Sequence, residues 1–207
     1  MQLDVLFKND RILAVNKPPG LLSVPGLGPQ NQDCIASRAA ALFPGAMIVH
    51  RLDSETSGVM VLALDPDTHR RLSMQFEKRR TEKAYVAIVQ GQPDGDEGEI
   101  DLPIRKDIDN RPMSIVDRVH GKPSVTRWRV IEHLGDRTRL DLVPVTGRTH
   151  QLRLHLSAVG HPILGDSLYA PAAVRFLAPR LLLHARLLMV TDPGTQERLT
   201  FESPVPF

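Results

Sequence analysis

The polar stretch HRLDSETSG, residues 50–58, carries the groups best suited to chemistry, and the apolar run VMVLAL follows it at residues 59–64. Asp53 therefore stands beside a strand that we expect to be buried, where an unpaired carboxylate is costly. An arginine partner would fork onto both carboxylate oxygens, lower the pKa of Asp53 and keep it an ionised nucleophile at neutral pH. A structural Asp–Arg bridge or a solvated loop is the alternative that these residues leave open.

Three further islands are more polar than packing requires. Lys83-Ala84-Tyr85 begins a predicted strand, the stretch GRTHQLRLH at residues 147–155 places Arg148 just before a predicted helix, and His184 interrupts the apolar stretch RLLLHA at residues 180–185. The residues around Tyr85 favour an ordinary place on an amphipathic strand, because it alternates with smaller apolar neighbours.

Several kinds of site are disfavoured. The intervals between His150, His155 and His161 are five and six residues, which fit neither a helical zinc motif nor a zinc-finger pair. Cys34 is the single cysteine, which excludes an internal disulfide and a cysteine-based zinc cluster. Phosphate-binding loops, dinucleotide fingerprints and the GxSxG motif of serine hydrolases are missing from the sequence. We therefore expect neither a metal nor a nucleotide cofactor.

The composition is that of a globular protein with a substantial core, since 42% of the 207 residues are apolar. No apolar run approaches the roughly 18 residues that span a membrane, and the start MQLDVLFKND does not resemble a secretory signal, so we expect a cytoplasmic protein. The 26 basic residues, of which 20 are arginine, suit RNA binding, although a GC-rich genome explains that excess equally well. Scarce aromatic residues, at 4%, argue against a base-stacking platform.

The pattern of elements predicts an α+β fold with a mixed, largely antiparallel sheet in two lobes around a catalytic cleft. Asn9-Asp10 indicates a hairpin, and Asp65-Pro66 is a strong helix start. We read residues 1–207 as a single catalytic domain. The expected helices cover residues 33–43 (with Asp33 as the N-cap), 65–80 and 149–160, and the expected strands include residues 58–64, 82–91, 98–104, 113–119, 124–134, 138–146, 181–190 and 198–204.

Five motifs in order, NKPPG, HRLDSETSG, KAY, GRTHQLRLH and LLLHA, resemble the RluA family of pseudouridine synthases, and the resemblance extends from about Leu6 to Phe207. It implies the pseudouridine synthase fold without an N-terminal S4 domain. It also implies isomerisation of specific uridines in structured RNA, with the target base flipped out of its stack and no cofactor. Within the family the resemblance is greatest to members that act on a 23S rRNA stem-loop and on tRNA anticodon stem-loops.

The resemblance also implies roles for individual residues. Asp53 would be the catalytic aspartate, Tyr85 would pack against the uracil and assist a later proton abstraction, and Arg148 would pair with Asp53. Leu182 or Leu183 would form the apolar wall of the uracil pocket. The remaining expected substrate-binding residues are His50, Arg51, Lys17 and Thr56.

Arg51 has a more specific expectation, because residues 51 and 53 of an extended segment point to the same side. A planar guanidinium can stack on bases and bond to phosphate, so we expect Arg51 to enter the RNA and hold the flipped state. His50 is expected to support the loop by hydrogen bonding.

Two rival functions follow from the same residues. One is a glycosidase-like hydrolase that uses Asp53 with His50 as base and needs Glu55 as a second acid. The other is a non-catalytic RNA-binding module, which would have no need of a buried anion. RNA is the expected partner in the family interpretation, and we expect a monomer that is not attached to a membrane. The candidate phosphate contacts are Lys78, Arg79, Arg80, Arg105 and Lys106.

Overall fold

The computed structural model describes residues 2–207, which form two compact units. The first unit comprises the chain up to Lys83 together with His184–Pro206, and the second comprises Ala84–Leu183 with Phe207. The α+β class and the largely antiparallel pairing predicted from the sequence are confirmed. Among the described residues no helix is long and apolar enough to cross a membrane.

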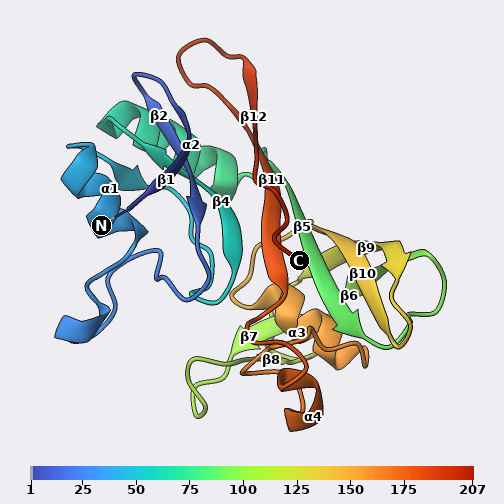
Figure 1. Ribbon diagram of the computed structural model, residues 1–207. Helices are drawn as coiled ribbons and strands as arrows, with labels where there is room; N and C mark the ends of the chain where they lie inside the picture. The colour runs from blue at the N-terminus through green and yellow to red at the C-terminus, as the bar shows by residue number, and fades with distance from the viewer. Residues whose placement is uncertain (1) are drawn as a thin grey trace. The chain divides into compact units, whose positions relative to one another are not determined.

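The first unit is built on a sheet in which the neighbouring strands are β1-β2-β4-β11, with β3 paired to β4 and β12 paired to β11 (Figure 1). Strand β4 is antiparallel to β2 and β3 but parallel to β11. The elements are β1 (Asp4–Lys8), β2 (Ile12–Lys17), the 3-10 turn η1 (Pro29–Asn31), α1 (Ile35–Leu42), β3 (Met47–Ile48), β4 (Ser57–Ala63), α2 (Pro66–Glu77), β11 (Leu183–Thr191) and β12 (Arg198–Glu202).

The buried strand β4 is the centre of this unit, since each of its residues is buried. Val59, Val61 and Ala63 of β4 pack in one core with Leu72 of α2. The helix begins where the sequence predicts: Asp65 caps it by accepting a hydrogen bond from the backbone N–H of Thr68 at 2.9 Å, and Pro66 takes the first helical position. The polar loop before β4 therefore ends on a rigid element.

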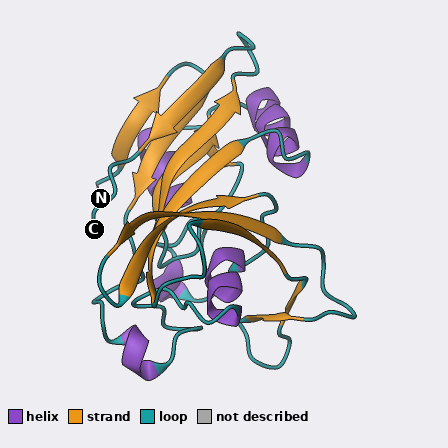
Figure 2. Cartoon of the chain, turned by 90° about the vertical axis from the view of Figure 1, so that its right-hand side faces the viewer, coloured by secondary structure: helices purple, strands orange, loops and turns teal. Residues whose placement is uncertain are grey.

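The second unit has a sheet in the order β5-β10-β9-β6, all antiparallel, and the separate hairpin β7-β8. Figure 2 shows that strands and loops make up most of the chain and that the helices are short. The elements are β5 (Glu82–Gln90), β6 (Glu97–Asp101), β7 (Ile104–Lys106), β8 (Ser114–Val116), β9 (Val125–His133), β10 (Arg137–Pro144), α3 (Gln151–Ala158) and α4 (Ala172–Arg175).

Two local predictions need correction, and three short elements are absent from the predictions. Helix α1 is capped by Cys34, whose sulfur accepts from the backbone N–H of Ser37 at 3.3 Å, because Asp33 instead pairs with Arg38 at 2.7 Å. Helix α2 ends at Glu77 rather than near Arg80. The short elements η1, β3 and α4 were not predicted, since two to four residues show no periodicity.

Candidate active site

The backbone on the N-terminal side of Asp53 is held by Ser23. The Ser23 hydroxyl donates to the carbonyl oxygen of Leu52 at 2.7 Å and accepts from the Leu52 N–H at 3.1 Å. The hydroxyl therefore both donates to and accepts from the backbone of Leu52, the residue before Asp53. Ser23 lies in the Pro/Gly-rich loop that follows Lys17, where no local residue pattern predicts its contact with Leu52.

The backbone on the other side of Asp53 is held by Lys17. This side chain is 0% exposed, and its ammonium donates to the carbonyl oxygens of Pro18, Leu21 and Ser54 at 2.9, 2.7 and 2.8 Å. The Ser54 oxygen also accepts from the N–H of Gly20 at 2.8 Å. Burying an ammonium is costly unless its donors are satisfied, so these bonds explain how it is tolerated. They also tie the loop after β2 to the residue that follows Asp53.

His50 joins the same loop to the sheet. Its Nε2 accepts from the backbone N–H of Val61 in β4 at 3.0 Å. This bond lies just beyond the last pair of β3 with β4, which joins Ile48 to Leu62. Its ring stacks on Phe76 in the last turn of α2, with centroids 4.4 Å apart. Burial, assisted by the charge of Lys83, lowers the pKa of His50 to about 3. His50 is thus a neutral acceptor that supports the loop, and its bonded Nε2 is poorly placed to act as a general base.

The start of β4 explains the serine and glycine that close the polar stretch. Ser57 lies opposite His184 in the parallel pairing of β4 with β11, and its hydroxyl lies 2.9 Å from His184 Nδ1. The His184 Nε2 is 3.3 Å from the Ser203 carbonyl oxygen, so it carries the proton and Nδ1 accepts from Ser57. Gly58 has φ +115°, and an added Cβ would lie 2.2 Å from the carbonyl oxygen of Ala185, a contact that excludes any other residue.

The remaining predicted groups of the first unit differ in accessibility. Asp53 is half-buried, and its carbonyl oxygen accepts from the N–H of Thr56 at 3.1 Å, which closes a turn. Arg51 is exposed. Thr56 is buried, and within residues 2–207 its hydroxyl has no hydrogen-bond partner. The unit therefore presents the Arg51 guanidinium and the Asp53 carboxylate on either side of Leu52, whose backbone is held by Ser23.

In the second unit, Gln151 shapes the loop that carries Arg148. Its Oε1 accepts from the Thr146 hydroxyl at 2.6 Å and from the Arg148 N–H at 3.0 Å. Its Nε2 donates to the carbonyl oxygen of Val125 at 2.9 Å and to the hydroxyl of Thr126 at 3.0 Å. The amide nitrogen thus donates two hydrogen bonds and the amide oxygen accepts two, which fixes the loop to strand β9.

The side chain of Arg148 is only partly satisfied. It is half-buried, one terminal nitrogen lies 3.5 Å from the carbonyl oxygen of Pro123, and its buried Nε has no partner among the described residues. A guanidinium in this condition is suited to an anionic partner. Asp53 belongs to the other unit, so the predicted pairing of Arg148 with Asp53 stays a prediction.

A buried ion pair holds the first turn of α3. Arg153 and Asp166, with side chains 2% and 1% exposed, form a bidentate pair at 2.8 and 2.7 Å. Asp166 Oδ1 also accepts from the backbone N–H groups of Leu168 and Tyr169 at 2.8 and 3.0 Å. The Tyr169 hydroxyl in turn lies 2.8 Å from His150 Nδ1, and His150 is held in the left-handed region with φ 56°. The network anchors the start of α3, whose N-cap, His150, lies two residues after Arg148.

Tyr85 and the two candidate leucines belong to one apolar cluster. Tyr85 is half-buried on β5 opposite Leu142, and it packs against the cluster that contains Leu183. Leu183 is buried within that cluster, whereas Leu182 is half-buried at its edge. Leu182 therefore has the surface that a wall residue needs.

The three histidines considered for a metal have other partners. His150 meets Tyr169, both ring nitrogens of His155 are bonded within the second unit, and His161 Nδ1 lies 3.1 Å from the Gln90 carbonyl oxygen. Within the part of the chain that the structure describes, no group of three or more His, Cys, Asp or Glu side chains is arranged to hold a metal.

Comparisons with known proteins agree with these observations. Residues 11–158 match the family model described as RNA pseudouridylate synthase. The chain is 48% identical over 206 residues to the dual-specificity RNA pseudouridine synthase RluA of Escherichia coli (strain K12), covering 99% of this chain and 94% of that protein. The RluA of Haemophilus influenzae is 46% identical with the same coverage. The solved structure of human RNA pseudouridylate synthase domain containing 1 has a TM-score of 0.83 at 32% identity, covering 100% of this chain and 84% of that one.

Proposed function

The chain belongs to the RNA pseudouridylate synthase family and isomerises uridine to pseudouridine in RNA, and from that premise we propose that Asp53 carries the reaction. The observation that carries this proposal is the double clamp on its backbone, by Ser23 at Leu52 and by Lys17 at Ser54. A reacting group must be held in one geometry by neighbours that are themselves fixed. Asp53 meets that requirement, and it is half-buried rather than sealed from a substrate.

The isomerisation breaks the N1–C1′ bond, turns the base and joins C5 to C1′, after which a proton leaves C5 and N1 gains one. Asp53 acts as an anion, by attacking C1′ or C6 or by removing a sugar proton. Because a stacked uridine hides its glycosidic bond, the base is flipped out before Asp53 reaches it. Arg148 pairs with Asp53 as its cationic partner, a role supported by the unsatisfied Nε of Arg148.

The second unit supplies the surface for the base. Tyr85 packs against the uracil ring and assists the loss of the C5 proton, directly or through water. Leu182 forms the apolar wall in preference to Leu183, because Leu183 is committed to the core. Both units act together as one catalytic domain.

The remaining residues of the first unit divide by exposure. Arg51 is exposed, and within residues 2–207 its side chain forms no hydrogen bond or ion pair, which supports its entry into the gap left by the flipped base. His50 supports the loop, and its bonded Nε2 leaves the hydrolase alternative without its base. The burial of Lys17 favours positioning of the Asp53 loop over the direct substrate contact expected from the sequence. Thr56 lies on the turn that Asp53 closes, and its burial likewise favours a role in the loop over the substrate contact expected from the sequence.

The substrates are a 23S rRNA stem-loop, tRNA anticodon stem-loops, or both. The dual-specificity relatives support this assignment, because they are nearly half identical over almost the whole chain. We further propose a cytoplasmic monomer. Sedimentation of the purified protein with and without RNA tests the monomer, and a stable dimer would contradict it.

Asp53→Asn is the decisive experiment, with Glu55→Gln as the matched control from the same loop. Asp53→Asn should fold and bind RNA without forming pseudouridine, while Glu55→Gln should keep more than half of the wild-type rate. Pseudouridine formation by the mutant at a tenth of the wild-type rate would remove Asp53 from the role. Release of free uracil by the wild type, abolished in Glu55→Gln, would favour the hydrolase.

A further inference from the structure

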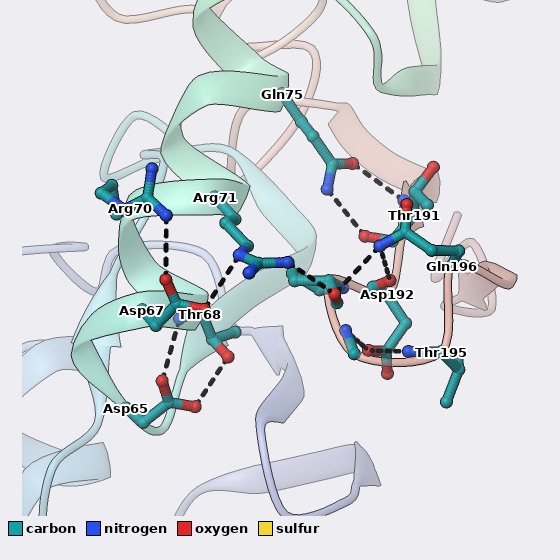
Figure 3. Close-up of polar contacts among 12 residues, drawn as sticks. Asp65, Asp67, Thr68, Arg70, Arg71, Gln75, Thr191, Asp192, Thr195 and Gln196 are labelled. Atoms are coloured by element: carbon teal, nitrogen blue, oxygen red, sulfur yellow. Dashed lines mark hydrogen bonds and ion pairs between the residues drawn. The ribbon is translucent and has the colours of Figure 1, made fainter.

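A basic pocket lies in the first unit, away from the clamped Asp53 loop, between α2 and the turn that joins β11 to β12. Four cations line it, Arg70, Arg71, Lys78 and Arg80, and its volume is about 450 Å³. Figure 3 shows α2 facing this turn, with Arg71 and Gln75 reaching across to it. A space of this size accommodates a ligand much larger than a single ion.

The two walls of the pocket are bonded to one another. The Gln75 amide accepts from the Thr191 N–H at 2.8 Å and donates to the Thr191 carbonyl oxygen at 2.7 Å. Arg71 donates to the carbonyl oxygen of Pro193 at 3.0 Å, and Gln196 donates to the same oxygen at 2.9 Å (Figure 3). The pocket is therefore preformed, and a ligand would not have to order it.

The end of α2 fixes a third side. Arg79 adopts φ 54°, in the left-handed region that usually selects glycine. This conformation closes the helix by two backbone hydrogen bonds. The N–H of Arg80 donates to the carbonyl oxygen of Gln75 at 2.8 Å, and the N–H of Arg79 donates to the carbonyl oxygen of Phe76 at 3.2 Å. A non-glycine residue there costs about 1 kcal/mol. The bond to Gln75 fixes the backbone of Arg80, which lies on the wall of the pocket.

The charge of the pocket is poorly balanced. Asp67 pairs with both Arg70 and Arg71, each at 2.9 Å, so one carboxylate faces two guanidiniums. Lys78 and Arg80 have no acidic partner among residues 2–207. The helix dipole accounts for a cation at Lys78, in the C-terminal cap, but it does not account for arginines in the middle of α2. Surfaces without a ligand normally intersperse both signs of charge.

We propose that this pocket binds the phosphodiester backbone of the RNA substrate, at a segment outside the modified nucleotide. The proposal rests on the RNA-modifying function of the chain. From Arg70 to Lys78 the helix rises about 12 Å, which is more than one phosphate group occupies. A run of phosphates matches that length and the preference of guanidinium forks for phosphate oxygens.

The pocket and the Asp53 loop share one rigid support. Phe76, in the last turn of α2, stacks on His50 at the start of the polar stretch. Lys78 follows Phe76 by two residues, so the backbone contact and the reacting group are fixed relative to one another within one unit. RNA held at the pocket is thereby positioned for Asp53.

The test compares two double variants that remove the same charge from exposed side chains. Lys78→Ala with Arg80→Ala empties the pocket of its unpaired cations, and Lys8→Ala with Arg129→Ala removes two exposed cations elsewhere. RNA affinity is measured by fluorescence anisotropy over a range of salt, with a labelled anticodon stem-loop and with the same loop on a shortened stem. Pseudouridine formation is measured at saturating RNA.

The pocket variant should weaken binding of the full stem-loop at least tenfold at 0.1 M salt. The log–log salt slope should become shallower by about 1.5, the loss expected for two phosphate contacts. The control should change the Kd less than threefold and leave turnover at saturating RNA unchanged. Equal effects of the two variants, or an unchanged Kd and slope in the pocket variant, would overturn the proposal. A wild type that binds RNA through the pocket but forms no pseudouridine would instead contradict the proposed function.

Discussion

The loop that carries Asp53 and the loop that carries Arg148 are both fixed by buried polar side chains, but the chemistry differs. In the first unit Lys17 donates to backbone oxygens, and Ser23 bonds both backbone groups of Leu52. In the second unit the side chains bond one another as well as the backbone, through Gln151 and the ion pair of Arg153 with Asp166. The first arrangement clamps the residues on either side of Asp53, the proposed reacting group. The second holds the helix that follows Arg148.

This difference predicts how each region responds to damage. A backbone clamp controls the position of its neighbour, so its loss should reduce turnover together with stability. A buried ion pair leaves an uncompensated charge when one partner is removed, so its loss should act mainly on stability.

The largest effect is expected for Asp166→Asn, which removes the charge opposite Arg153. Asparagine keeps an oxygen for the N–H groups of Leu168 and Tyr169, which both bond Oδ1. The buried guanidinium is left unpaired, at a cost of about 3–5 kcal/mol in the free energy of unfolding, measured by urea denaturation. Adding Arg153→Met should restore most of that loss. Failure of the second change to restore stability would show that the charge is not the cause.

Lys17→Met should lower the free energy of unfolding by about 2–3 kcal/mol, because methionine fills the volume but leaves buried carbonyl oxygens without a donor. Turnover per folded molecule should fall about tenfold, a barrier increase of about 1.4 kcal/mol. Single-turnover assays below the unfolding transition separate the two effects. Asp166→Asn assayed in the same way should keep turnover within threefold. Equal losses of turnover in both variants would erase the distinction between the two regions.

His50 predicts a pH dependence of stability in the first unit. Its folded pKa is about 3, while an ordinary histidine has a pKa of 6.5, so the unfolded chain takes up an extra proton below pH 6.5. The stabilising contribution is complete above pH 6.5 and is lost as the pH falls toward 3, with about 2 kcal/mol lost by pH 5. His50→Gln, which can still accept from Val61, should remove that loss between pH 7 and 5 in urea titrations.

His155 is the counterpart in the second unit, and it sharpens the comparison. Burial lowers its pKa too, but the bond to the Leu102 carbonyl and the charge of Asp101 act in the opposite direction. His155→Gln should therefore alter the difference between pH 7 and 5 less than His50→Gln does. A larger change in His155→Gln than in His50→Gln would mean that burial lowers the pKa of His155 more than that of His50.

The smallest effect is expected for Ser23→Ala, which removes the hydroxyl bonded to Leu52. The cost should be about 1 kcal/mol of unfolding free energy, since a neutral hydrogen bond contributes about that much. Thr146→Val is the matched change in the second unit, because its hydroxyl bonds Gln151 and the Val125 N–H. Both melting temperatures should fall by a similar amount, but turnover should fall only in Ser23→Ala.

The fold class, most of the strands and the start of α2 follow from the amino-acid sequence alone. Those features depend on local patterns: apolar periodicity for β4, and the Asp65-Pro66 pair for the helix. The polar stretch at residues 50–58 and its resemblance to a family could also be recognised from the sequence, because the motif consists of adjacent residues.

The contacts that support that stretch are visible only in the folded chain. Lys17 and Ser54 are separated by 37 residues, and Ser57 and His184 by 127, so no window of sequence contains either contact. Gly58 is required by the backbone of β11, which arrives late in the chain. The basic pocket likewise joins α2 to a turn more than a hundred residues away. Such contacts form only when distant segments are packed together, because they depend on register and burial that local sequence does not contain.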